Sequence, residues 1–355
     1  MPLNAAPNPD LLDLVRETPL ARVSAPLPRP HPGFWAKLEC LSAGGMKARA
    51  ALSMLRGARL RGELRPGAPV VESTSGTLGV GLAFAGNALG HPIVLVVDSE
   101  LEPGMRALLR AHGARLEVVD RPHPVGGWQQ ARLDRVQRIC RDLPGAYWPD
   151  QYNNPDNPAG YDEMGAEIAR CLDRVDVLVC SVGSGGHSSG AIRAVRKRWP
   201  QARLIGVDTV GSTIFGQPAR PRVMRGLGSS IHPRNVAYEL FDEVHWVGPA
   251  EAVAACRTLA RDSFVTGGWS TGAVALVAAW ASRVEPGANV VTVFPDGPQR
   301  YLGTVFDDDY CRARGLLDCA TAIRPVEVAD PEVEATGWTR CRVISDPLVK
   351  LEVPA

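Results

Sequence analysis

The segment Val175–Gly190 reads VDVLVCSVGSGGHSSG, and it decides the fold. Its first part, Val175–Ser181, is a nearly unbroken apolar run, which predicts a strand buried on both faces. A glycine-rich turn, Gly183–Gly186, follows, and Ser188–Trp199 has the length and pattern of a helix. A buried strand that leads through such a turn into a helix is typical of parallel sheets covered by helices.

The same alternation recurs along the chain, so we expect an α/β protein whose parallel sheets are covered by helices on both faces. The other predicted strands are Val70–Glu72, Ile93–Asp98, Leu116–Val119, Leu204–Asp208 and Val290–Phe294. The other predicted helices are Lys47–Arg61, Val80–Leu89, Pro103–His112 and Ala273–Ser282. The stretch DLPGAYWPDQYNNPDNP at 142–158 is dense in Pro, Asn and Asp, which predicts a break between two units.

Composition excludes several classes of protein. The 355 residues suffice for two domains, and 39 basic against 38 acidic side chains argue against a nucleic-acid binder driven by bulk charge. No apolar window is long enough to cross a membrane, and the N-terminus does not resemble a signal peptide. The eight cysteines form no C-x-x-C pair, so we expect reduced thiols in a cytoplasmic protein and no metal site.

Three loops rich in glycine and hydroxyl groups open predicted helices, where ligands bind in parallel sheets. STSGTLG at 73–79 suits a carboxylate or another anion, or is an ordinary helix N-cap. GSGGHSSG at 183–190 suits a phosphate, although it is neither a Walker loop nor a GxGxxG motif. WSTGA at 269–273 offers hydroxyls for a ring nitrogen, or merely caps its helix.

Lys47 lies in AGGMKAR at 43–49 and is one of only four lysines. It follows a glycine pair and opens a predicted helix. A lysine in a first helical turn is disfavoured by the helix dipole, which helps to hold its amine neutral. A neutral amine is what Schiff-base chemistry requires. The alternative is a solvated surface lysine.

Seven segments in the same order resemble motifs of the cysteine synthase family. They are KLECLSAGGMKARAAL (37–52), STSGTLGVGLAFAG (73–86), DQYNNPDNP (150–158), GSGGHSSG (183–190), RGLGSS (225–230), STGA (270–273) and VFPDGPQRYLGT (293–304). The resemblance implies a fold-type II enzyme, similar to the β subunit of tryptophan synthase, with pyridoxal 5′-phosphate as cofactor.

The resemblance also implies a role for individual residues. Lys47 would bind the cofactor as a Schiff base and later remove the substrate's Cα proton. The implied cofactor-binding residues are Lys47, Thr77, Gly183, Ser184, Gly185, Gly186, His187 and Thr271. The implied substrate-carboxylate residues are Thr74, Ser75 and Gln151. The chain departs from the family pattern at Ala48, Thr77, Leu78 and His187, which indicates an altered pocket around a retained lysine.

Arg225 precedes GLGSS, with Arg220 and Arg222 just upstream. Arginine suits phosphate, sulfate or thiosulfate oxygens, so Arg225 is a candidate substrate ligand, unless the loop is simply solvated. The set of motifs is most similar to the actinobacterial branch that includes S-sulfocysteine synthases. The resemblance therefore implies β-replacement on O-phosphoserine or O-acetylserine by thiosulfate or sulfide, through an aminoacrylate, giving S-sulfocysteine or cysteine.

Two other interpretations stay open. In the first, the chain is a synthase of another β-substituted alanine and uses an amine nucleophile. In the second, it is a binding protein that has kept the fold and lost catalysis. In every case we expect a small-molecule partner, no nucleic acid, no membrane, and a homodimer. The expected division is a smaller domain at 34–147, a larger one at 1–33 and 150–317, and a C-terminal extension at 318–355.

Overall fold

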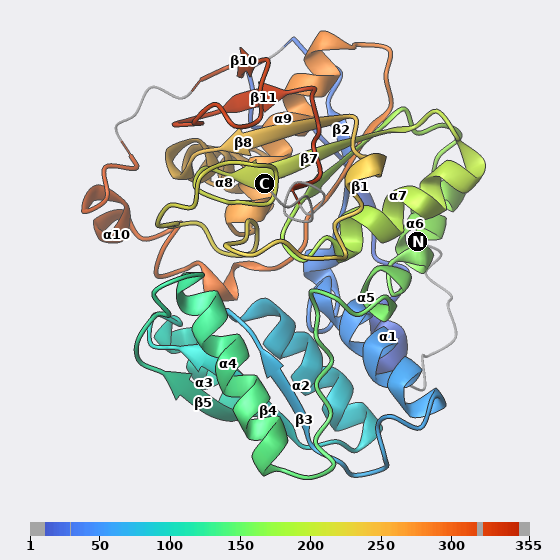
Figure 1. Cartoon of the computed structure of the whole chain (residues 1–355). Coiled ribbons are helices and arrows are strands. Elements are labelled where there is room, and N and C mark those ends of the chain that lie inside the picture. The colour runs from blue at the N-terminus through green and yellow to red at the C-terminus, as the bar shows by residue number, and fades with distance from the viewer. Residues whose placement is uncertain (1–10, 29, 318–321, 348–355) are drawn as a thin grey trace, which may run out of the picture.

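The computed structural model describes residues 11–28, 30–317 and 322–347, which form two β-sheets, one above the other in Figure 1. The larger sheet consists, in spatial order, of β1 (Leu20–Val23), β2 (Phe34–Lys37), β9 (Val290–Val293), β6 (Val177–Ser181), β7 (Arg203–Thr209), β8 (Glu243–Val247), β11 (Thr339–Cys341) and β10 (Val326–Val328). Its five central strands, β2 to β8 in this order, run parallel, and antiparallel pairs join β1 and β11 to them.

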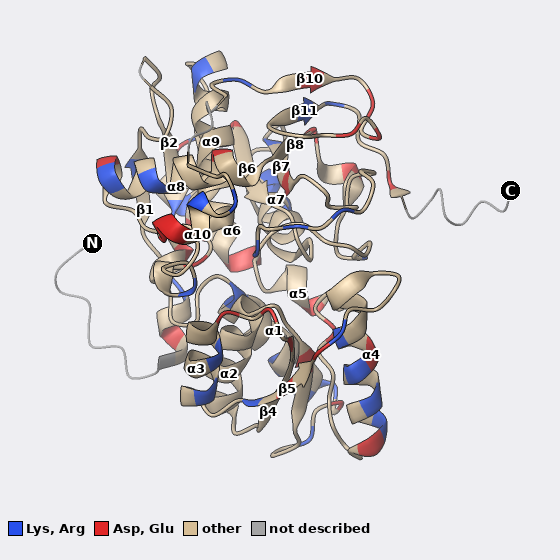
Figure 2. Ribbon diagram, turned by 90° about the vertical axis from the view of Figure 1, so that its left-hand side faces the viewer, with Lys and Arg blue, Asp and Glu red and all other residues tan. Residues whose placement is uncertain are grey.

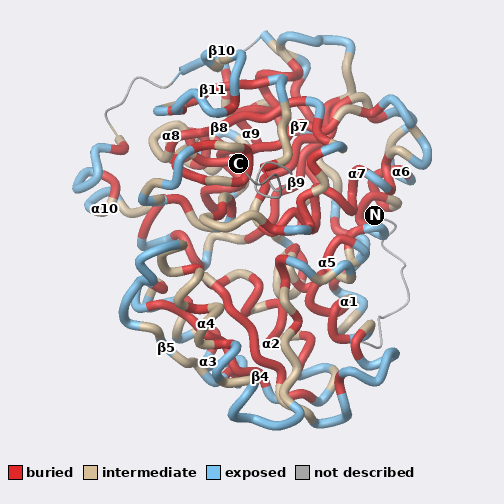
Figure 3. The backbone as a smooth tube through the Cα atoms, viewed as in Figure 1, coloured by how far each residue is buried: buried red, intermediate tan, exposed pale blue. Residues whose placement is uncertain are grey.

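Helices cover both faces of this sheet because successive side chains of its strands enter two different cores. In β6, Leu178 and Cys180 pack with α6 and α7, whereas Val177 and Val179 pack with α8 and α9. Figure 3 shows these central strands as buried. The helices around the larger sheet are α5 (Asp156–Ala159), α6 (Asp162–Cys171), α7 (Gly186–Arg198), α8 (Pro249–Ser263), α9 (Trp269–Val284) and α10 (Asp308–Arg312).

The smaller sheet has three parallel strands, β3 (Val70–Ser73), β4 (Ile93–Asp98) and β5 (Arg115–Val119). Val71, Val94 and Val96 face α4, while Val70 and Leu95 face the core shared with the helices on the other side. Those helices are α1 (Lys47–Leu60), α2 (Thr77–Leu89) and α3 (Pro103–Ala111), and α4 spans Gly127–Asp142. Short 3-10 helices are η1 (Leu11–Val15), η2 (Glu39–Leu41), η3 (Tyr238–Leu240) and η4 (Pro298–Arg300).

The predicted α/β class with parallel sheets and covering helices is confirmed. One boundary needs correction: β2 begins the range 34–147 expected for the smaller domain, but it is a strand of the larger sheet. The reason is that Phe34 and Ala36 pack in the core beneath α8 and α9. The other domain boundaries stay a prediction.

The C-terminal extension contributes β10 and β11, which lengthen the larger sheet beyond β8. Residues 318–321 and 348–355 of this extension, and residues 1–10 of the expected larger domain, lie outside the described residues. Among the helices that the structure describes, none is long and apolar enough to cross a membrane. Figure 2 shows that basic and acidic residues are interspersed along the ribbon of both halves.

Candidate functional site

Lys47 is the first residue of α1, as predicted, and two glycines place it there. Gly44 and Gly45 have φ angles of 74° and 67°, a conformation that favours glycine. The Met46 amide donates to the Pro295 carbonyl at 2.9 Å, which ties the loop to the end of β9. The Lys47 Nζ points to the Ser184 Oγ at 3.4 Å. The amine of one half of the molecule therefore meets the glycine loop of the other half.

Burial lowers the pKa of the Lys47 amine from 10.5 to about 8, and the Asp296 carboxylate opposes that shift. A larger fraction of the amine is therefore neutral near physiological pH than in a surface lysine. A neutral amine can act as a nucleophile and as a proton acceptor.

A buried ionic network holds the start of α1. The Arg49 guanidinium pairs with Glu39 at 2.8 Å and with Glu167 at 2.8 Å, and Glu167 also pairs with Lys37 at 2.5 Å. All four side chains are almost inaccessible to solvent. Because a buried charge is stable only when it is paired, this network fixes the backbone two residues from Lys47.

Two glycines of the loop between β6 and α7, Gly185 and Gly186, have no room for a side chain. Gly185 has a φ of 82°, and a Cβ there would lie 2.5 Å from the Asn235 backbone. A Cβ on Gly186 would lie 2.0 Å from the Asn157 Oδ1. Among the described residues, no side chain caps the N-terminus of the 13-residue helix α7. Free backbone N–H groups at a helix N-terminus suit a phosphate.

His187 is buried in the first turn of α7. Burial, together with the nearby Lys47 amine, lowers the pKa of its imidazole to about 3, so the ring is neutral. Its Nε2 has no hydrogen-bond partner among the described residues. A neutral ring of this kind can donate or accept a single hydrogen bond at a ligand.

Several other buried polar atoms around Lys47 also lack a partner within the described part of the chain. They are Asn157 Oδ1, Ser270 Oγ, Thr271 Oγ1 and Asp296 Oδ1. Buried polar groups are normally hydrogen-bonded, so a cluster of unpaired ones indicates a missing polar ligand. In a phosphorylated pyridine, the ring nitrogen and phosphate oxygens can accept from the Ser270 and Thr271 hydroxyls, and the ring hydroxyl can donate to one of the two acceptor oxygens. The residues present therefore fit the expected cofactor.

The start of α9 differs from the sequence prediction. The sequence pattern predicts a loop at 269–273 and a helix from Ala273, but Trp269 already begins α9. Gly268 has an extended backbone, which allows the helix to start directly after it. Ser270 and Thr271 consequently lie in the first helical turn, both fully buried.

The loop at 73–79 is held by its own side chains and by Arg300. The Thr74 Oγ1 accepts from the Gly76 and Gly79 backbone amides at 2.9 and 3.2 Å, which holds the turn that leads into α2. Arg300 donates to the Ser75 carbonyl at 2.5 Å and to the Thr77 Oγ1 at 3.2 Å. These contacts present the loop to the cavity as a fixed structure.

Gln151 and Thr77 have partners inside the protein. The Gln151 Nε2 donates to the Ser73 carbonyl at 2.9 Å, and the backbone N–H of Gln151 donates to the Glu72 carboxyl at 3.1 Å. The Thr77 Oγ1 donates to Asp296 at 3.3 Å. Burial raises the pKa of Glu72 to about 8. Gln151 thus ties the segment between the sheets to the end of β3.

A cavity of about 630 Å³ lies between the two halves, a size typical of small-molecule sites. The predicted site residues that line it are Lys47, Thr74, Ser75, Thr77, Gln151, Gly183, Ser184 and Arg225. The others, Gly185, Gly186, His187 and Thr271, are not part of its wall, although the first three continue the glycine loop from Ser184. Arg225 pairs with Glu100 at 2.7 Å, which joins the larger half to the smaller one.

Sequence reasoning missed several residues of the site. Asp296 and Asn157 stand inside quoted motifs, VFPDGPQRYLGT and DQYNNPDNP, but received no role. Arg132, in the middle of α4, also lines the cavity and pairs with Asp98. No sequence motif marks it, because its position depends on how α4 packs on β3 and β4.

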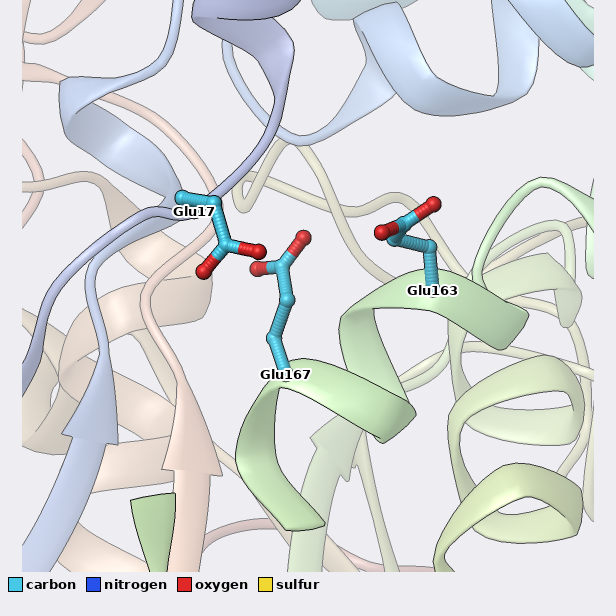
Figure 4. Close-up of side chains that lie close together, drawn as sticks. All are labelled: Glu17, Glu163 and Glu167. Carbon is cyan, nitrogen blue, oxygen red and sulfur yellow. The ribbon is translucent and has the colours of Figure 1, made fainter. Parts of the chain in front are cut away.

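Three carboxylates gather elsewhere, at Glu17, Glu163 and Glu167, with oxygens within 4.8 Å of one another (Figure 4). Glu17 pairs with Arg170, and Glu163 lies 4.0 Å from Arg16. Glu167 belongs to the ionic network at Arg49. Because arginine and lysine already balance these acids, they give no ground for a metal site.

Comparison with known proteins agrees with this geometry. The family described as "Pyridoxal-phosphate dependent enzyme" matches residues 11–296. The N-(2-amino-2-carboxyethyl)-L-glutamate synthase of Ralstonia nicotianae is 34% identical over 321 residues, 88% of this chain and 95% of that protein. The same enzyme of Cupriavidus metallidurans is 35% identical over 306 residues, 84% of this chain and 89% of that protein. The solved structure of an O-acetylserine dependent cystathionine beta-synthase from Helicobacter pylori has a TM-score of 0.78 and 27% identity, and covers 84% of this chain and 99% of that one.

Proposed function

Because the chain belongs to the family of pyridoxal-phosphate-dependent enzymes, we propose that it replaces the β-substituent of an activated serine with an amine that carries carboxylates. The observation that carries this proposal is the set of arginines in the cavity wall. They are Arg132, Arg220, Arg222 and Arg225. Arginine is the side chain best suited to phosphate and carboxylate groups, so this cavity favours substrates with several negative charges.

The relatives support the choice of an amine. Two enzymes at 34% and 35% identity are named for N-(2-amino-2-carboxyethyl)-L-glutamate. In that product the nitrogen of glutamate is bonded to the β-carbon of a three-carbon amino acid. We propose the same bond for this chain: the C–O bond at Cβ of O-phosphoserine or O-acetylserine breaks, a C–N bond forms, and the amine releases a proton.

Pyridoxal phosphate supplies the electron sink that stabilises negative charge at the substrate Cα. We propose that its phosphate is held by the glycine loop and the N-terminus of α7, and its ring nitrogen by the Thr271 hydroxyl. The proposed cofactor set is Lys47, Thr77, Gly183, Ser184, Gly185, Gly186, His187 and Thr271. The Lys47 Nζ then removes the proton from Cα, for which its lowered pKa suits it.

We propose that Thr74, Ser75 and Gln151 bind the donor's carboxylate, since the loop lies at the N-terminus of α2. Arg225 is the proposed ligand for the leaving phosphate. It stands at the cavity with a solvent-accessible partner, Glu100, from which an incoming anion can displace it. The homodimer and the cytoplasmic location stay predictions.

The test is product analysis with purified holoenzyme. O-phosphoserine or O-acetylserine is combined with equal concentrations of L-glutamate, sulfide and thiosulfate, and the products are identified by mass spectrometry. The expected product is the glutamate adduct. Exclusive formation of cysteine or S-sulfocysteine would refute the amine acceptor, and no product from any donor would indicate a protein that has lost catalysis.

A sulfur nucleophile is the second candidate. The favouring observation is the fold similarity to a cystathionine beta-synthase that depends on O-acetylserine. Thiosulfate is also an anion that the arginines can bind. The competition experiment decides between the two candidates, because both acceptors meet the same enzyme at the same concentration.

A further inference from the structure

Three of the four arginines in the cavity wall have a carboxylate partner. Arg132 pairs with Asp98, Arg225 with Glu100 at 2.7 Å, and Arg220 with Glu334. Arg222 differs: among the described residues no carboxylate oxygen lies within 4.0 Å of its guanidinium. Within the described part of the chain, its guanidinium makes a single hydrogen bond, from Nη2 to the Ser230 Oγ at 3.0 Å. The other N–H groups of Arg222 are therefore available to a ligand.

Asp208 is an acid near Arg222, but it balances the positive charge of the guanidinium only in part. A Cβ on Gly228 would lie 2.7 Å from the Arg222 Nη1 and 3.2 Å from the Asp208 Oδ1, so Asp208 stands near Arg222 without pairing with it directly. Burial raises the pKa of Asp208 to about 7, so a good part of this carboxyl is protonated at neutral pH. Burial lowers the pKa of Arg222, Asp208 opposes that shift, and Arg225 adds to it. The cavity thus contains a partly buried guanidinium without a full counter-charge.

The position of Arg222 indicates which part of a substrate it meets. Its neighbours Pro221 and Val223 are exposed, so this segment forms the mouth of the cavity. Thr74 and Ser184, which line the cavity near Lys47, are buried and form its floor. A molecule that reacts at the floor through its amine extends its far end towards the mouth.

We propose that Arg222 binds the side-chain carboxylate of the attacking amine and so selects an acidic amino acid as acceptor. This inference rests on the proposed function. A carboxylate supplies the counter-charge and the acceptor oxygens that the guanidinium lacks, through charge-assisted hydrogen bonds. A neutral amide in the same place leaves the guanidinium unpaired, and sites built for a charged partner discriminate strongly against a neutral one.

The experiment compares two acceptors of nearly equal shape, L-glutamate and L-glutamine. The ratio of their kcat/KM values is measured for wild-type holoenzyme, Arg222→Gln and Arg222→Lys with one donor. Wild type is expected to prefer glutamate at least tenfold, equivalent to about 1.4 kcal/mol. Arg222→Gln loses this preference while its rate with glutamine changes little, and Arg222→Lys keeps part of it because the charge remains.

Arg234→Gln is the matched control, since Arg234 is exposed and lies in the same region of the sequence but outside the cavity wall. Its glutamate preference is expected to equal that of wild type. Equal losses with both acceptors in Arg222→Gln, or an unchanged ratio, would overturn the assignment. A wild type that uses neither amine but reacts with sulfide or thiosulfate would instead refute the proposed function, so the two failures are distinguishable.

Discussion

Replacing Asp296 with asparagine is expected to lower the pKa of the Lys47 amine below its wild-type value of about 8. Burial is the larger influence on this amine and favours the neutral form, while the Asp296 carboxylate favours the charged form. Asparagine has nearly the same shape and can still accept the hydrogen bond that the Tyr301 hydroxyl donates at 2.6 Å. The substitution therefore removes the charge and leaves the packing in place.

The size of the effect in wild type follows from the pKa. A lysine with a pKa of 10.5 is roughly 0.03% neutral at pH 7, whereas one with a pKa of about 8 is about 9% neutral, roughly a 300-fold gain. The shift corresponds to about 3 kcal/mol, most of it from desolvation of the ammonium group. Asp296→Asn raises the neutral fraction further, because only the opposing contribution is lost.

The assay measures how fast the apoenzyme captures pyridoxal phosphate at a series of pH values, followed by the visible absorbance of the bound cofactor. Only the neutral amine reacts, so the rate rises with pH and inflects at the pKa of Lys47. Wild type is expected to inflect near 8 and Asp296→Asn at a lower pH. An inflection near 10.5 in wild type, or a higher one in the variant, would refute the reasoning.

Three further predictions concern the surroundings of Lys47. Arg49→Met is expected to lower the free energy of unfolding by about 3–5 kcal/mol, since it leaves the buried Glu39 carboxylate without a counter-charge; urea denaturation should show a far smaller loss for the exposed Arg61→Met. Gly186→Ala should weaken cofactor affinity at least tenfold, because the added methyl group displaces the neighbouring Asn157 side chain. Gly104→Ala, where the Cβ would lie in open space, should leave the affinity unchanged. A fluorescence titration of the apoenzyme with the cofactor measures both. Because the pKa of Glu72 rises from 4.5 to about 8 on folding, wild-type stability falls as pH rises between these values, and denaturation of Glu72→Gln should lack this fall.

The sequence predicted the central part of the fold because buried parallel strands are continuous apolar runs. Val177–Ser181 and Ile93–Asp98 needed no tertiary information. The edge strands were different: β10, at Val326–Val328, has mostly exposed side chains, and β11 is only three residues long. Such segments become strands through pairing with β8 and with each other, which a local pattern does not reveal.

The site also contains residues that the sequence predicts and residues that only the folded structure reveals. Lys47 and the glycine loop were predictable because positive φ angles and a crowded backbone demand glycine next to them. Arg132 and Arg222 were not singled out as ligands, because the sequence gives no sign of which arginine has a carboxylate partner. That property depends on where Asp98, Glu100 and Glu334 come to lie after folding.

The central claim, that Lys47 is the residue that holds the cofactor, has a direct test. Holoenzyme is reduced with borohydride, digested, and searched by mass spectrometry for peptides that carry the reduced cofactor. The adduct is expected on the peptide that contains Lys47 and to be absent in Lys47→Ala. An adduct on Lys37 or Lys197, or no adduct in a protein that has taken up pyridoxal phosphate, would contradict the account.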